Sequence, residues 1–202
     1  MVIFLRHGET VFNKEHKFQG VSDAPLTEDG IRQAKAMGIF LKAYHPAKYI
    51  LSPLPRVYQT YSCIRESADA PYDINPALSE ISYGAWEGLT KQQASQDPLW
   101  HNREDNRFSF IHPGSYKNKR GESYKQLYER LQLFFSEIFK KHGHENIAVI
   151  AHQGVMVAAK KYYENLSDDV ASHIRSPNNT VLCVTQSGGS YTVADVVIQY
   201  GG

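Results

Sequence analysis

The chain has 202 residues, of which 42% are hydrophobic and 21% are charged, as in an ordinary globular protein. Its formal net charge of +1 gives no indication of a nucleic-acid partner, so any anion binding must come from a local cluster of basic residues. The two cysteines are too few for a disulfide framework, no Cys/His set has the spacing of a metal site, and no apolar run matches a signal peptide or a membrane span. We therefore expect a single cytoplasmic domain over residues 1–202, monomeric or homodimeric, with no metal, other cofactor, membrane or nucleic-acid partner.

The chain begins with an apolar run at residues 2–5 that predicts a short buried strand. Arg6, His7 and Gly8 follow it directly. In an open α/β sheet, ligands bind at the carboxyl ends of the strands, which is where these residues would lie. A fixed cation, an imidazole that can act as a base or a nucleophile, and a glycine that permits close approach to a ligand suit a phosphoryl-group site.

The rest of the chain alternates between helical and strand patterns. Apolar residues at helical spacing predict helices that begin near residues 27, 53, 90, 123, 155 and 167. Short apolar runs predict strands at 49–52, 72–74, 146–151, 181–185 and 191–198, with Gly188 and Gly189 in the turn of a C-terminal antiparallel hairpin. This order predicts the α/β class, as a three-layer αβα sandwich with a mainly parallel central sheet.

Residues 97–120 show no periodicity, and we interpret them as a lid inserted over the site. Between residues 99 and 120, five Lys/Arg side chains stand against Glu104 and Asp105, a local charge of +3. We expect Arg103 and Arg107 to hold an anionic substrate and Trp100 to stack on it. The alternative is a solvated surface excursion without a function.

Polar residues also follow two other predicted strands. Arg56 comes a few residues after the second strand, and His152-Gln153-Gly154 follows the strand at 146–151. If the sheet is parallel, these ends meet Arg6 and His7 at one edge, so that two histidines and two arginines could converge on one small anion.

The ordered set of motifs resembles the histidine phosphatase superfamily, in its phosphoglycerate-mutase-like branch. The motifs are Leu5-Arg6-His7-Gly8-Glu9-Thr10 with Asn13 after it, Ser52-Pro53-Leu54 with Arg56, Gln59 and Thr60, Glu80 with Tyr83-Gly84 and Trp86-Glu87-Gly88, Gly121-Glu122-Ser123-Tyr124, and His152. Each motif is weak alone, whereas the set in this order is highly specific.

The resemblance implies that His7 attacks phosphorus and forms a phosphohistidine. It further implies that side chains, without a metal ion, hold the phosphoryl oxygens, namely Arg6, Arg56, His152, Asn13 and Gln19. Glu80 would protonate the leaving oxygen and then activate water, which requires burial or the substrate charge to raise its pKa. We expect Glu87 to brace its loop and Glu122 to serve the N-terminus of the helix that follows. Gln153 departs from the family pattern, where glycine often follows the second histidine, and it is a further candidate for substrate contact.

Three functions stay open from the sequence. The first is a metal-independent phosphomonoesterase acting on a small anionic phosphorylated metabolite. The second is a cofactor-dependent phosphoglycerate mutase, whose family members carry a longer insertion with an arginine pair and a longer C-terminal tail, neither of which this chain shows. The third is a non-catalytic phospho-ligand-binding protein. The shorter chain favours the first.

Overall fold

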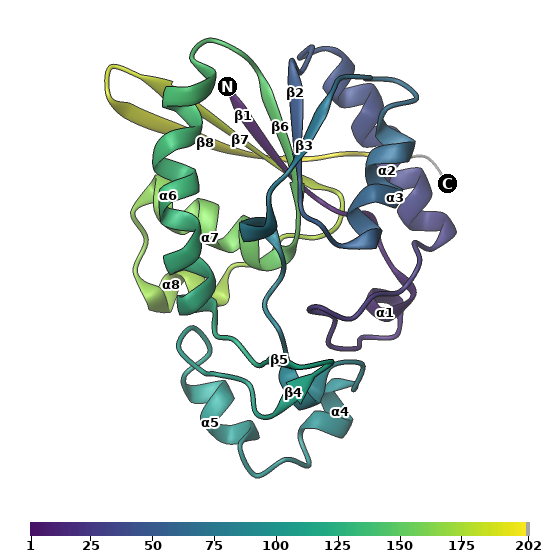
Figure 1. Ribbon diagram of the computed structural model, residues 1–202, viewed down its shortest axis with the longest axis vertical. Coiled ribbons are helices and arrows are strands. Elements are labelled where there is room, and N and C mark those ends of the chain that lie inside the picture. Colours follow the sequence, from purple (N-terminus) through teal and green to yellow (C-terminus); the bar gives the residue numbers. More distant parts are fainter. Residues whose placement is uncertain (201–202) are drawn as a thin grey trace.

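The computed structural model describes residues 1–200 and is built around a six-stranded sheet (Figure 1). Its strands in chain order are β1 (Val2–Arg6), β2 (Lys48–Leu51), β3 (Tyr72–Ile74), β6 (Ile147–Ala151), β7 (Thr180–Ser187) and β8 (Ser190–Val197). In space the order is β3-β2-β6-β1-β7-β8. The first four strands run parallel, whereas β7 pairs antiparallel with both β1 and β8. This arrangement confirms the predicted mainly parallel sheet with a C-terminal hairpin.

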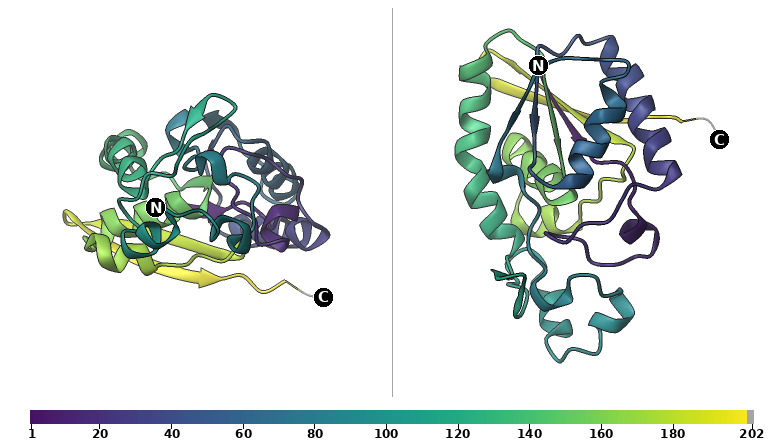
Figure 2. Two further views of the ribbon diagram at one scale, coloured as in Figure 1. Left: turned by 90° about the horizontal axis from the view of Figure 1, so that it is seen from below. Right: turned by 45° about the vertical axis from the view of Figure 1, so that its right-hand side comes forward.

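Helices cover both faces of the sheet, which gives the three predicted layers (Figures 1 and 2). One face packs against α2 (Glu28–Lys42) and α3 (Pro55–Ile64), and the other against α6 (Tyr124–His142) and α7 (Gln153–Glu164). Ile3 and Leu5 of β1 belong to the first apolar cluster, whereas Phe4 between them belongs to the second. Because successive side chains of a strand point to opposite faces, this uninterrupted apolar strand is buried only if each face has its own helix layer.

The helix starts follow local capping chemistry. Thr27 accepts a hydrogen bond from the Gly30 amide at the start of α2, and Ser123 forms a capping box with Gln126 at the start of α6. The sequence, which is polar and without clear periodicity from Val11 to Pro25, predicts a long loop there, but the structure forms α1 (Val11–Lys14) within it, beginning at a Thr10 capping box. Two further short helices are α4 (Lys91–Ala94) and α8 (Asp168–His173). None of the helices within residues 1–200 combines the length and the apolar character that crossing a membrane requires.

The insertion at residues 97–120 lies below the carboxyl ends of the parallel strands in Figure 1. It contains α5 (Trp100–Asp105) and a small hairpin of β4 (Ser115–Tyr116) and β5 (Lys119–Arg120), where the sequence predicted no regular structure. These elements are too short for a period to appear in the sequence. Phe108 anchors the insertion, because its ring packs with Val157 of α7 and Ala171 of α8.

A second anchor of the insertion is His112, which lies in an aromatic cluster. Its ring centroid is 4.7 Å from that of Tyr83, 5.2 Å from Phe110 and 5.3 Å from Trp86. Its Nδ1 lies 2.9 Å from the Glu122 carbonyl oxygen, which can only accept, so Nδ1 carries the proton. Burial lowers the pKa of His112 to about 4, so the ring is neutral at neutral pH.

This shifted pKa predicts an acid-sensitive contribution to stability. Because the unfolded imidazole takes up its proton near pH 6.5 and the folded ring does not, stability falls as the pH drops from about 6.5 towards 4. Between pH 7 and pH 5 this single group should lower the free energy of unfolding by about 2 kcal/mol. In H112N, whose amide keeps the donor to Glu122, the difference between urea unfolding at pH 7 and pH 5 should shrink by that amount. An unchanged difference in H112N would contradict the assignment.

Candidate active site

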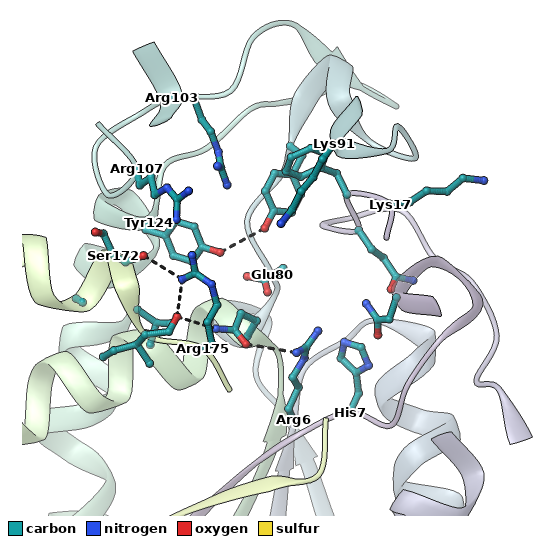
Figure 3. A pocket seen from close by; sticks show the side chains of 18 residues that line it. Arg6, His7, Lys17, Glu80, Lys91, Arg103, Arg107, Tyr124, Ser172 and Arg175 are labelled. Atoms are coloured by element: carbon teal, nitrogen blue, oxygen red, sulfur yellow. Dashed lines mark hydrogen bonds between the residues drawn. The ribbon is translucent and has the colours of Figure 1, made fainter. Parts of the chain in front are cut away.

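The site lies where the parallel strands end, on the side of the sheet that faces the insertion. Arg6 ends β1, and His7 continues its pairing with β6 through an N–H···O bond of 3.0 Å to Ala151. His152 follows β6, and Arg56 is in the first turn of α3 after β2. A cavity of about 210 Å³ opens above these ends and takes in residues from the N-terminal loop, the insertion, α7 and α8 (Figure 3).

His7 presents a neutral imidazole whose Nε2 lone pair accepts a hydrogen bond from Arg56. Its Nδ1 lies 2.8 Å from the Gly8 carbonyl oxygen, so Nδ1 carries the proton and Nε2 is unprotonated. The side chain is only 3% exposed. Burial, with the nearby charges of Arg56 and Arg6, holds the pKa of His7 well below its usual range. The nitrogen is therefore available as a nucleophile at neutral pH.

Arg56 and His152 lie beneath this imidazole and are fully buried. The Arg56 Nε donates to His7 Nε2 over 3.2 Å, and its Nη2 donates to His152 Nδ1 over 3.2 Å. His152 Nε2 then donates to the Ser52 hydroxyl over 2.6 Å. The structure thus brings together the two histidines and two arginines that the strand ends predicted, although Arg56 and His152 do not line the cavity themselves.

Several donors at the cavity are unused within residues 1–200. Gln19 Oε1 accepts from the Thr10 hydroxyl over 2.6 Å, which leaves its buried Nε2 without a partner among the described residues. Arg6 Nε is likewise buried without one in that part of the chain. Asn13 uses its Oδ1 to accept from the amide of Thr10 over 3.2 Å and from Asn178 over 3.4 Å, so its own amide N–H groups stay available. A buried donor without a partner destabilises a fold by about 1–3 kcal/mol, and an anion in the cavity is a suitable acceptor for such donors.

Gln153 orients Arg6. Its Oε1 accepts from Arg6 Nη1 over 3.3 Å and from the Ser176 amide over 3.0 Å. Its Nε2 donates to the Ile174 carbonyl oxygen over 3.3 Å. Gln153 lines the cavity, as expected of a substrate contact, but its polar atoms are engaged in holding Arg6 and the chain after α8.

Glu80 lies over the site on an irregular loop and is 4% exposed. One of its oxygens accepts from the Ile81 amide and the other from the Gly154 amide, both over 3.0 Å. Burial raises the pKa of Glu80, against the opposing effect of these bonds and of the arginines, which is the direction a proton donor needs. A Cβ at position 154 would lie 2.3 Å from Glu80 Oε1, so only glycine leaves room for the carboxyl group.

Of the three insertion residues proposed to bind substrate, two line the cavity. These are Arg103 and Arg107, which both pair with Glu104. Trp100 is not among the lining residues. The Trp100 ring centroid is 5.7 Å from that of Trp86. The Arg103 guanidinium lies 5.4 Å from the Trp100 centroid. In the structure Trp100 supports Arg103 through a cation–π contact instead of facing the cavity.

A family model described as histidine phosphatase superfamily (branch 1) matches residues 2–199. The chain belongs to this superfamily. It is 28% identical to a 2,3-bisphosphoglycerate-dependent phosphoglycerate mutase of Parabacteroides distasonis, over 87% of this chain and 82% of that protein. It is 29% identical to an adenosylcobalamin/alpha-ribazole phosphatase of Salmonella typhimurium, over 75% of this chain and 73% of that protein. Membership of the histidine phosphatase superfamily supports a phosphatase or mutase enzyme.

The fold of this histidine phosphatase superfamily member matches solved structures over nearly its whole length. The crystal structure of the alpha-ribazole phosphatase from Shigella flexneri superposes with a TM-score of 0.83 and covers 98% of this chain and 96% of that one. At 22% identity this likeness establishes the fold alone.

Two carboxylates near the site have structural roles in this superfamily member. Glu87 accepts from the amides of Gly20, Val21 and Ser22, which confirms that it braces a loop. The expectation for Glu122 is wrong, because it accepts from the Ser82 amide and pairs with Arg130, while Ser123 caps the helix. The hydroxyl of Ser123 caps the helix, so the carboxylate of Glu122 is free to bind the neighbouring loop.

Sequence reasoning missed several residues of the site. Arg130 holds the loop before Glu80 through the Ser79 carbonyl oxygen at 2.6 Å, and Asn178 donates to the His7 carbonyl oxygen over 2.7 Å. Neither belongs to a motif with a local signal. Among the other cavity residues, Lys17, Lys91, Ser172 and Arg175 belong to none of the quoted motifs, whereas Tyr83 and Tyr124 belong to motifs but were given no role in the site. Among the described residues, no group of three or more His, Cys, Asp or Glu side chains is arranged to hold a metal ion.

Proposed function

We propose that this protein is a phosphomonoesterase that hydrolyses a small phosphorylated metabolite through a phosphohistidine at His7, without a metal ion. The observation that carries the proposal is the neutral, unprotonated Nε2 of a buried His7, surrounded by unused donors at Arg6 and Gln19. A nucleophilic nitrogen among fixed cations and N–H donors fits phosphoryl transfer, where positioning and electrostatics supply most of the rate.

The first step forms the phosphoenzyme. His7 Nε2 attacks phosphorus, the bond between phosphorus and the leaving oxygen breaks, and the Glu80 proton goes to that oxygen. Arg6 and Arg56 offset the negative charge on the equatorial oxygens. The binding of a phosphoryl dianion exchanges the contact between Arg56 and His7 for one to the phosphoryl group.

The second step restores the enzyme. Water attacks the phosphorus of the phosphohistidine, Glu80 as a carboxylate accepts the water proton, and the N–P bond breaks to release phosphate. Glu80 thereby returns to its protonated state. Its two backbone hydrogen bonds keep it in place through both protonation states.

A mutase is the second candidate, because a relative that is 28% identical is named a phosphoglycerate mutase. A mutase would pass the phosphoryl group from His7 to a second glycerate phosphate instead of to water. A coupled assay for transfer between glycerate phosphates, run beside phosphate release, separates the two. Transfer that outpaces release would replace the phosphatase proposal with the mutase.

Turnover that is independent of metal tests the proposal directly. With p-nitrophenyl phosphate as substrate, we expect the same rate of phosphate release before and after dialysis against EDTA, because guanidinium groups do the work of Mg²⁺. The matched control adds Mg²⁺ back to the treated enzyme. No turnover, or turnover only after the addition of Mg²⁺, would overturn the proposal.

A further inference from the structure

The cavity carries more positive charge than a phosphoryl group needs. Among the described residues, six Lys and Arg side chains line it, against the single carboxyl group of Glu80: Arg6, Lys17, Lys91, Arg103, Arg107 and Arg175. Arg6 and the buried Arg56 beneath it, which pairs with Asp23 over 3.2 Å, lie at the phosphoryl end of the cavity. The remaining cations lie farther up the cavity, around the part of a substrate beyond the ester oxygen.

Arg175 is one of three cavity cations, with Arg6 and Lys91, for which the described residues supply no ion-pair partner. Its Nη1 donates to the Ser172 carbonyl oxygen over 3.1 Å and to the Ile174 carbonyl oxygen over 2.8 Å. Within residues 1–200 it forms no ion pair, in contrast to Arg103 and Arg107, which share Glu104. The backbone carbonyls therefore engage Nη1 of this exposed side chain and leave Nε and Nη2 to bind a ligand in the forked geometry that suits an oxyanion.

The structure couples Arg175 to the phosphoryl end of the cavity. The Ile174 carbonyl oxygen that accepts from Arg175 also accepts from Gln153, and Gln153 in turn holds Arg6. One short chain of hydrogen bonds thus connects two guanidinium groups at different places in the cavity. A ligand with two anionic groups at a matching separation would meet both without rearrangement.

Tyr124 places a hydroxyl at the same end of the cavity as Arg175. In Figure 3 the Arg175 guanidinium lies beside Tyr124, on the other side of Glu80 from His7, and Arg103 points towards them from the insertion. The Tyr124 hydroxyl lies 3.3 Å from that of Tyr83. Burial raises the pKa of Tyr124 while the charges of Arg103 and Arg175 oppose the rise, so both cations act on one hydroxyl. The apolar side chains of Val157, Ala171 and Ile174 also line the cavity.

We propose that the substrate carries a second anionic group, a carboxylate or a second phosphoryl group, which Arg175 binds together with Arg103 and Tyr124. This inference rests on the proposed phosphatase function and specifies its substrate class. The ester is then a short molecule with an acid at each end.

A series of matched esters tests the second-anion site. Phosphate monoesters of ω-hydroxy acids of increasing chain length are each compared with the monophosphate of the diol of equal length, which replaces the carboxylate by a neutral hydroxyl. The diol bisphosphates form the third arm and separate a phosphoryl group from a carboxylate as the second anion. At one or more chain lengths we expect kcat/KM for the acid or the bisphosphate to exceed that of the neutral ester by about 10-fold to 100-fold, as for hydrogen bonds to a charged group.

Two substitutions of Arg175, with a control at Arg120, test whether Arg175 causes that preference. In R175Q the preference for the second anion should fall towards unity, mainly through KM, and R175K should keep part of it because the charge is retained without the fork. R120Q removes an equal charge from the exposed β5 strand outside the cavity and should keep the preference of the wild type. The inference is overturned if no chain length favours a second anion, or if R175Q slows the charged and neutral esters equally. Failure to hydrolyse any ester would instead overturn the phosphatase function itself.

Discussion

Replacing His7 by alanine should lower kcat/KM for phosphate esters by about 10⁴-fold or more, as for other catalytic nucleophiles. The reason is that Nε2 of this ring is the unprotonated nitrogen at the cavity, and among residues 1–200 no other imidazole lines it. Initial rates of phosphate release measure the loss. A quench in alkali, where a phosphohistidine survives, should show labelled protein for the wild type and none for H7A.

His101 supplies the matched control, because it is an exposed histidine on α5 outside the cavity. H101A should keep both turnover and the alkali-stable label. Binding of inorganic phosphate to H7A, measured by calorimetry, separates loss of chemistry from loss of the fold. If H7A hydrolyses esters at the wild-type rate, His7 is not the nucleophile. If the wild type binds phosphate esters tightly without turnover, the protein is a binding module.

The convergence of the strand ends was predictable because it depends on topology. An apolar run followed by polar residues recurs at β1 and β6, and parallel pairing of these strands places His7 and His152 at one edge. Glu80 has no such pattern, since the loop that carries it is irregular. Only the resemblance to a family predicted its part in the site, and its geometry depends on Gly154 and Arg130 from distant elements.

Contacts between distant segments explain what the sequence did not predict. Trp100 stands among basic residues, a pattern that fits stacking on a substrate or on an arginine equally well. Its neighbours Phe18 and Trp86 decide between these, and both are far from it in the chain. Arg175 likewise had no local signal, because its place in the cavity depends on the short segment after α8 that Gln153 holds.

Glu80→Gln should separate the two chemical steps. For an alkyl phosphate, whose leaving oxygen needs a proton, we expect kcat to fall by about 10²-fold to 10⁴-fold. For p-nitrophenyl phosphate, whose leaving group departs as an anion, the first step should proceed and the second should stall, because no carboxylate activates water. Stopped-flow absorbance should then show a burst of nitrophenolate equal to the enzyme concentration, followed by slow release of phosphate.

The pH profile gives a second readout of the same group. Burial raises the pKa of Glu80, and the protonated acid is the form that acts first, so the wild-type kcat for an alkyl phosphate should fall as the pH rises through that pKa. In E80Q the kcat should not show this fall with rising pH.

The amide nitrogen of the glutamine in E80Q would face the N–H of Gly154 or Ile81, so thermal unfolding is measured in parallel to account for about 1–3 kcal/mol of lost stability. E129Q, on the exposed side of α6, is the matched control and should leave the rates and the pH profile unchanged. Equal slowing of both substrates in E80Q without a burst would show that Glu80 supports the fold of the site and does not move the proton.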